Sequence, residues 1–150
     1  MGKEIERKFL VKGEFKSFSV KNINITQAYL SVDPDRTVRL RITDNEAFLT
    51  IKTSSGRTGI TRNEWEIKIS LPIAHELIEV CLPGRILKTR YIVPYGEHDF
   101  EVDVFHGRHE GLVVAEIELP DEGEEFSRPL WLGEEVTGKP EYYNANLIEK

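Results

Sequence analysis

Charged and apolar residues alternate through most of this chain, in short runs that are separated by turn-forming residues. In residues 3–11, Ile5 and Phe9 alternate with Glu4 and Glu6. This period of two predicts a β-strand, because successive side chains of a strand point to opposite faces. Seven further runs repeat the pattern, namely residues 24–32, 37–43, 47–53, 63–70, 86–93, 99–106 and 112–119. The connections between these runs are short, which favours hairpins and an antiparallel sheet.

Charges on these strands come as pairs of the same sign, two residues apart. The six pairs are Glu4/Glu6, Arg39/Arg41, Glu64/Glu66, Lys88/Arg90, Glu101/Asp103 and Glu116/Glu118. Members of a pair lie about 6.5–7 Å apart on one face of a strand. Alternation usually indicates a sheet with one packed and one solvated face, but a solvated face gains from mixed signs. The repeated like-sign pairs therefore favour a face that binds charged ligands.

A sheet of about eight strands tends to curl or close. If it closes with the charged face inward, its lumen contains eight carboxylates and seven cations: Glu4, Glu6, Glu64, Glu66, Glu101, Asp103, Glu116 and Glu118, with Lys8, Arg39, Arg41, Lys52, Lys68, Lys88 and Arg90. Unpaired buried charge is very costly, so such a lumen must hold water, ions or a charged ligand. Carboxylate clusters bind Mg²⁺ or Mn²⁺, and arginine and lysine bind phosphate. A metal-bound polyphosphate would satisfy both sets.

One helix is well indicated between Ser70 and Pro83. Ser70 suits an N-cap, Pro72 lies in the first turn, and the apolar residues that follow have helical spacing. Shorter helical segments are expected in residues 13–18, 124–132 and 141–148. The tail from Pro120 is expected to form a capping helix with an acidic start. The length of 150 residues predicts one domain over residues 1–150.

Composition excludes several classes of function. The net charge of −6 argues against a general nucleic-acid binder. No apolar run is long enough for a membrane span, and the charged N-terminal residues do not form a signal peptide, so a cytoplasmic location is expected. Cys81 is the one cysteine, so no intrachain disulfide can form. His106-Gly107-Arg108-His109 is expected to be a hairpin tip rather than a metal site.

Residues 4–8, Glu-Ile-Glu-Arg-Lys, match the ExExK signature near the start of the CYTH proteins, also called triphosphate tunnel metalloenzymes. The later elements of that family pattern follow in order, as Arg39-x-Arg41, Lys52, Glu64-x-Glu66, Lys88-x-Arg90, Asp103 and Glu116-x-Glu118. Residues 135–138 and 142–147 are also similar to the short bacterial members. The chain therefore resembles this family over essentially its whole length.

The resemblance implies an α+β fold, a closed antiparallel eight-stranded β-barrel or tunnel with a few helices packed outside. It implies that two Mg²⁺ or Mn²⁺ ions are bound by Glu4, Glu6, Glu116 and Glu118, assisted by Asp103, Glu64 and Glu66. It implies phosphate binding by Lys8, Arg39, Arg41, Lys52, Lys88 and Arg90. Tyr29 matches a tyrosine with a proton-accepting role, which would require a lowered pKa because a free tyrosine has a pKa of about 10. A packed aromatic at the tunnel wall is the alternative for Tyr29.

The activity that the resemblance implies is metal-dependent hydrolysis of a small-molecule triphosphate. Among the possible substrates we favour inorganic tripolyphosphate, which would give pyrophosphate and phosphate, because the chain is short and carries no added domain. Class IV-type adenylate cyclase and thiamine triphosphatase activities stay open, as does a non-catalytic polyphosphate or nucleotide binder. A plain structural barrel is the remaining alternative. No nucleic-acid or membrane partner is expected, and a homodimer is left open.

Overall fold

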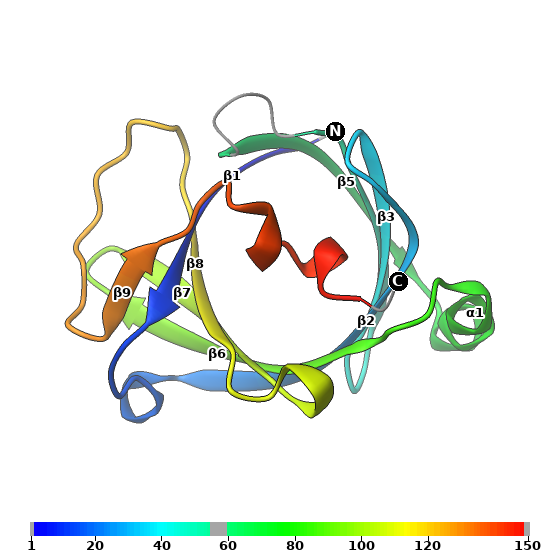
Figure 1. The fold of residues 1–150 in the computed structure, drawn as a ribbon, viewed down its shortest axis with the longest axis horizontal. Helices are drawn as coiled ribbons and strands as arrows, with labels where there is room; N and C mark the ends of the chain where they lie inside the picture. Colours follow the sequence, from blue (N-terminus) through cyan, green and yellow to red (C-terminus); the bar gives the residue numbers. More distant parts are fainter. Residues whose placement is uncertain (1, 55–59, 149–150) are drawn as a thin grey trace.

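The computed structural model describes residues 2–54 and 60–148 of the chain, and eight of its strands close into a barrel (Figure 1). They are β1 (Gly2–Val11), β2 (Lys21–Asp33), β3 (Arg36–Ile42), β4 (Ala47–Lys52), β5 (Thr61–Ile69), β6 (Ile86–Tyr95), β7 (His98–Phe105) and β8 (Val113–Glu118). Neighbouring strands pair antiparallel in the order β5-β4-β3-β2-β6-β7-β8-β1, and β1 pairs with β5 to complete the ring. The predicted barrel is confirmed, and each expected strand overlaps an observed one.

Strand β1 pairs with three strands, and this arrangement links the two ends of the sequence. One edge of β1 pairs with β8, while the other pairs with β5 near Glu4 and with a ninth strand, β9 (Leu132–Glu135), near Phe9. At Gly133 the two backbones approach so closely that a Cβ would lie 2.9 Å from the Leu10 carbonyl oxygen. The sequence analysis did not predict β9, because four residues containing a glycine give little alternation.

Helix α1 (Leu71–Leu77) lies outside the barrel, as predicted, and continues in a 3₁₀ turn (Ile78–Val80). The Ser70 side chain accepts a hydrogen bond from the Ile73 N–H, which confirms the predicted N-cap. Of the other predicted helical segments, residues 13–18 and 141–148 form only short 3₁₀ turns, which are Lys16–Phe18, Pro140–Tyr142 and Asn144–Asn146, and the helix expected in residues 124–132 is wrong. A further 3₁₀ turn, Gly107–His109, connects β7 to β8 at the predicted hairpin tip.

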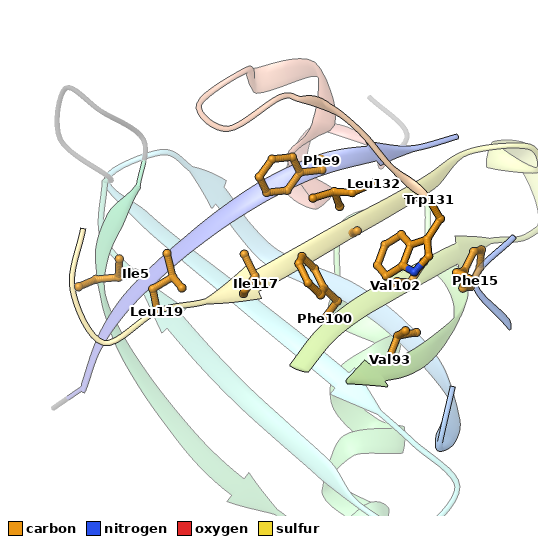
Figure 2. Packing of buried hydrophobic residues seen from close by; sticks show 11 residues of the cluster. Ile5, Phe9, Phe15, Val93, Phe100, Val102, Ile117, Leu119, Trp131 and Leu132 are labelled. Atoms are coloured by element: carbon orange, nitrogen blue, oxygen red, sulfur yellow. The ribbon is translucent and has the colours of Figure 1, made fainter. Parts of the chain in front are cut away.

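The expected capping helix after Pro120 is wrong, because residues 119–131 form an irregular segment. This segment still covers the outer wall of the barrel, as Figure 2 shows for Trp131. Phe100 packs against Trp131 with 5.3 Å between ring centroids, and against Phe126 with 6.1 Å. Aromatic contacts of this kind provide the cover without requiring helical periodicity.

The largest apolar cluster therefore lies outside the barrel wall rather than inside it. It joins outward-facing residues of β1, β6, β7 and β8 to the covering segment: Ile5, Phe9, Phe15, Val93, Phe100, Val102, Ala115, Ile117, Leu119, Trp131 and Leu132 (Figure 2). A second outer cluster contains Leu40, Ala47 and Ala74, and it holds α1 against the wall. Because the apolar residues point outward, the alternate residues of the same strands point into the barrel.

No helix in the described part of the chain is long and apolar enough to cross a membrane.

Candidate active site

The interior of the barrel holds a cavity of about 550 Å³. Thirteen of the fourteen residues that were predicted to form the site line it: Glu4, Glu6, Lys8, Tyr29, Arg39, Arg41, Lys52, Glu64, Glu66, Lys88, Arg90, Glu116 and Glu118. The alternation of the strands brings them together, since each occupies an inward position opposite the apolar outer wall. The charged face thus points inward, the one step that sequence reasoning had to assume.

Carboxylates gather where β1 meets β5 and β8. Burial, then the neighbouring Glu116 and Glu4, raise the pKa of Glu6 to about 8. Although burial opposes the shift, Lys8 and Arg90 hold the pKa of Glu116 well below its usual range. A hydrogen bond between Glu6 and Glu116 adds to this shift. Near neutral pH the two carboxyl groups therefore carry one negative charge between them, and Glu6 holds the proton.

This donor set fits a divalent cation. A carboxyl group that is protonated because it is buried beside other carboxylates can exchange its proton for a metal ion, and oxygen is the ligand atom that Mg²⁺ and Mn²⁺ prefer. Within residues 2–54 and 60–148, no group of three or more carboxylate, imidazole or thiol side chains is arranged so that it could hold a metal ion without further ligands. Magnesium commonly binds through one or two carboxylates plus phosphate oxygens and water, so the described geometry suits a metal that binds together with a phosphate ligand.

Other carboxylates of the set are paired with cations or lie nearer to solvent. Glu4 accepts hydrogen bonds from Lys52 Nζ at 3.0 Å on both oxygens, and Arg62 lies 3.7 Å away. Burial opposes the shift, but Lys52 and Arg62 lower the pKa of Glu4. Glu64 and Glu118 are less buried, and burial followed by the nearby Glu4 raises the pKa of each.

Cations line the wall opposite the carboxylates. The guanidinium of Arg41 donates to Gln27 Oε1 at 3.0 and 3.2 Å, and burial together with Arg39 and Arg90 lowers its pKa to about 10. The Nε atom of Arg39 is buried and has no hydrogen-bond partner among the described residues. A buried N–H group without a partner is costly. Because Arg39 lines the cavity, its unpartnered Nε–H group indicates a site for an anionic acceptor.

Lys8 lies between the two sets of charges. Its Nζ atom is 3.6 Å from Glu116 Oε1 and donates to the Tyr142 carbonyl oxygen at 3.2 Å. Burial opposes the charged form, but Glu116 and Glu6 raise the pKa of Lys8. The ammonium group therefore stays charged although the side chain is almost fully buried.

Asp103 is the one predicted site residue outside the cavity lining. It is 1% exposed, and its oxygens accept from Lys88 Nζ at 2.7 Å and from Arg90 Nε and Nη2 at 2.8 and 3.0 Å. Burial lowers the pKa of Lys88 to about 7, and the pairing with Asp103 opposes that shift. The contacts suit a residue that orients two cations, whereas its predicted role as a metal ligand stays a prediction.

Tyr29 is 4% exposed and lines the cavity. Burial raises its pKa, although Arg39 and Arg41 act in the opposite direction. A tyrosine that accepts a proton needs the reverse shift. The geometry therefore favours the alternative, an aromatic side chain packed at the tunnel wall.

Sequence reasoning placed one cation wrongly in the lumen and missed another. Lys68 is exposed and pairs with Glu46 at 3.0 Å, because β5 reaches the rim of the barrel there. Arg62 was missed since the predicted strand began at residue 63, whereas β5 begins at Thr61. Arg62 continues the alternation of Glu64 and Glu66, which was the available signal. Asn144 also lines the cavity, but it was missed because its uncharged side chain belongs to none of the alternating charged runs.

Comparisons with known proteins agree with this architecture. A family model for the CYTH domain matches residues 2–150. The inorganic triphosphatase of Acetivibrio thermocellus is 45% identical over 150 residues, covering 99% of this chain and 95% of that protein. The inorganic triphosphatase of Nitrosomonas europaea is 37% identical over 149 residues, covering 96% and 95%.

Solved structures extend the comparison. The crystal structure of the inorganic triphosphatase NE1496 is similar with a TM-score of 0.65 and 34% identity, covering 96% of both chains. The PH1012 protein from Pyrococcus horikoshii has a TM-score of 0.62 at 18% identity over 79% of both chains, which shows a shared fold alone.

Proposed function

This chain belongs to the CYTH family, and from that premise we propose that it is a divalent-metal-dependent inorganic triphosphatase. The substrate would be inorganic tripolyphosphate, and the products pyrophosphate and orthophosphate. The observation that carries the proposal is a cavity inside the barrel that is lined by both a carboxylate cluster and a cation cluster. Relatives that bear the name inorganic triphosphatase match nearly the whole chain, which supports the same assignment.

Positioning and charge neutralisation are the main tasks of the cations. Arg39, Arg41, Lys52, Lys88 and Arg90 would hold the phosphoryl oxygens, and the free Nε of Arg39 supplies a donor that no described residue uses. Lys8 would stabilise charge on the phosphoryl group under attack. Phosphoryl transfer requires little covalent chemistry from the protein, so such fixed cations contribute much of the rate.

Glu4, Glu6, Glu116 and Glu118 would hold the Mg²⁺ or Mn²⁺ ions, two in this proposal, with Glu64 and Glu66 assisting. A bound ion of this kind neutralises phosphate charge and lowers the pKa of a coordinated water. Asp103 would fix Lys88 and Arg90 in the orientation that receives the phosphate. Water would attack the terminal phosphorus, the bond from that phosphorus to the bridging oxygen would break, and pyrophosphate would leave with the bridging oxygen. The protons of the water would stay on the orthophosphate or pass to the solvent.

A substrate panel tests the proposal directly. The purified chain is assayed with tripolyphosphate, thiamine triphosphate and ATP at equal concentration, with Mg²⁺ and with Mn²⁺. We expect the fastest phosphate release from tripolyphosphate, and its loss when the metal is chelated. Preferred turnover of thiamine triphosphate or cyclic AMP formation from ATP would instead support the other family activities, and tight tripolyphosphate binding without turnover would support a binder.

The net charge of −6 argues against nucleic acid as the ligand, whereas the cations that line the cavity suit a small polyanion. A cytoplasmic location stays a prediction, which cell fractionation tests. The homodimer stays an open alternative, which light scattering of the purified chain tests.

A further inference from the structure

The C-terminal segment, residues 137–148, runs from β9 into one end of the barrel. Figure 1 shows this red segment within the ring of strands. The Thr137 hydroxyl oxygen accepts a hydrogen bond from the Lys8 N–H at 2.9 Å, which fixes the start of the segment against β1. Farther along, the Tyr142 carbonyl accepts from Lys8 Nζ at 3.2 Å, and the Tyr143 ring lies 5.7 Å from the same atom. The segment therefore contacts a cation of the active site.

Apolar packing closes this end of the tunnel. Ile148 is 6% exposed and belongs to a buried cluster with Ile86, Phe105 and Val114, which occupy inward positions on β6, β7 and β8. Toward the other end of β7 and β8, the inward positions carry Glu101, which is partly exposed, and Glu118, which is exposed. The tunnel is thus closed at the C-terminal segment and open at its acidic rim.

Asn144 carries the most specific contact of the segment. Its Oδ1 atom accepts from Lys88 Nζ at 2.9 Å and from Gln27 Nε2 at 3.3 Å. Arg41 donates to Gln27 Oε1, so the Gln27 Nε2 group must donate to Asn144, and this contact fixes the orientation of the Asn144 amide. The Nδ2 group then has no partner in the described part of the chain, and the residue lines the cavity beside Lys88.

We propose that Asn144 is a substrate-binding residue and that the closed end admits only an unsubstituted terminal phosphate. The Asn144 amide N–H would donate to a phosphoryl oxygen next to Lys88. The inference rests on the proposed triphosphatase function and adds a requirement for one bare end of the phosphate chain. Tripolyphosphate has two such ends, ATP has one, and diadenosine triphosphate has none.

Two substitutions at one position separate substrate binding from support of Lys88. Asn144→Ala removes both the acceptor for Lys88 and the donor for phosphate. Asn144→Asp keeps an acceptor for Lys88 but replaces the donor by a negative charge beside the phosphate. We expect Asn144→Ala to raise the KM for tripolyphosphate about tenfold with a smaller change in kcat, as loss of one hydrogen bond to a charged group predicts. Asn144→Asp should raise KM further.

Asn24→Ala provides the matched control on the outer wall. Asn24 also accepts a side-chain hydrogen bond, from Thr89 Oγ1 at 2.9 Å, but on the outward face of β2. Its KM should equal that of the wild type. If Asn144→Asp instead restores wild-type KM, Asn144 only orients Lys88 and the inference is overturned.

Binding measured by calorimetry in EDTA tests the closed end without turnover. We expect the wild type to bind tripolyphosphate and ATP, and to leave diadenosine triphosphate unbound. Binding of diadenosine triphosphate as tight as that of ATP would overturn the closed-end requirement. If the wild type hydrolyses tripolyphosphate while the Asn144 variants keep its KM, the inference fails and the proposed function stands. If the wild type neither binds nor hydrolyses any triphosphate, both fail.

Discussion

The inner and outer faces of the barrel wall are made by the same strands yet obey opposite rules. On β8, Glu116 faces the cavity and contacts Lys8, while the next residue, Ile117, is fully buried among aromatic side chains outside. The outer face gains stability from burial of apolar area, as an ordinary core does. The inner face gathers like charges, which costs stability and creates affinity for ions. Adjacent residues of one strand therefore have different roles, since one contributes to ligand binding and the next to the stability of the fold.

The largest expected effect comes from the inner face. Lys8→Ala should lower kcat/KM for tripolyphosphate by about 10²–10³-fold, because it removes a buried ammonium from the phosphate site. Circular dichroism should show an intact barrel, since Lys8 makes no contact in the outer cluster. Near wild-type turnover of this variant would contradict the claim that the inner face of the barrel carries ligand binding and catalysis.

The outer face should show the reverse outcome. Ile117 is 0% exposed. Ile117→Ala should lower the free energy of unfolding by about 2–5 kcal/mol, the usual cost of a cavity in a core. Urea unfolding measures the loss, and kcat per folded molecule should stay close to the wild-type value. A variant that keeps its stability but loses activity would contradict the assignment of this face.

Arg7 sharpens the comparison, because it precedes Lys8 and has the same charge but points outward. It donates to Glu135 at 2.6 and 2.8 Å and lies 5.1 Å from the Phe126 ring. Arg7→Ala should cost about 1–2 kcal/mol of stability through this partly exposed contact. Its kcat/KM should exceed that of Lys8→Ala by at least tenfold, which parallel assays of the two variants will show.

Lys68 marks the lower limit of these effects. Its exposed ion pair with Glu46 should contribute less than about 0.5 kcal/mol, so Lys68→Ala should leave both the unfolding midpoint and activity unchanged. A marked rise in KM would return Lys68 to the phosphate site, where the sequence pattern had placed it.

Alternation predicted the strands and the inward charges because it is local and has a fixed period. Lys68 and Arg62 show its limit, since a strand boundary decides whether an alternating residue reaches the cavity. The β9 strand and the C-terminal turns depend on contacts with β1 and Lys88, far away in sequence. Asn144 carries no charge and no periodicity, so only the folded arrangement brings it beside Lys88.

The pairing of β1 has a consequence for the order of folding. The strand synthesised first contacts residues near the other end of the sequence, as Arg7 and Glu135 are 128 positions apart. Such distant contacts delay folding, because a long loop must close before they contribute. During synthesis, β1 has no β8 or β9 to pair with until those strands are made, and Glu4, Glu6 and Lys8 on its inner side are exposed to water in the meantime. We therefore expect the ring to close late, so that a ribosome-bound chain lacking residues 113–148 has no complete tunnel and cannot begin catalysis early.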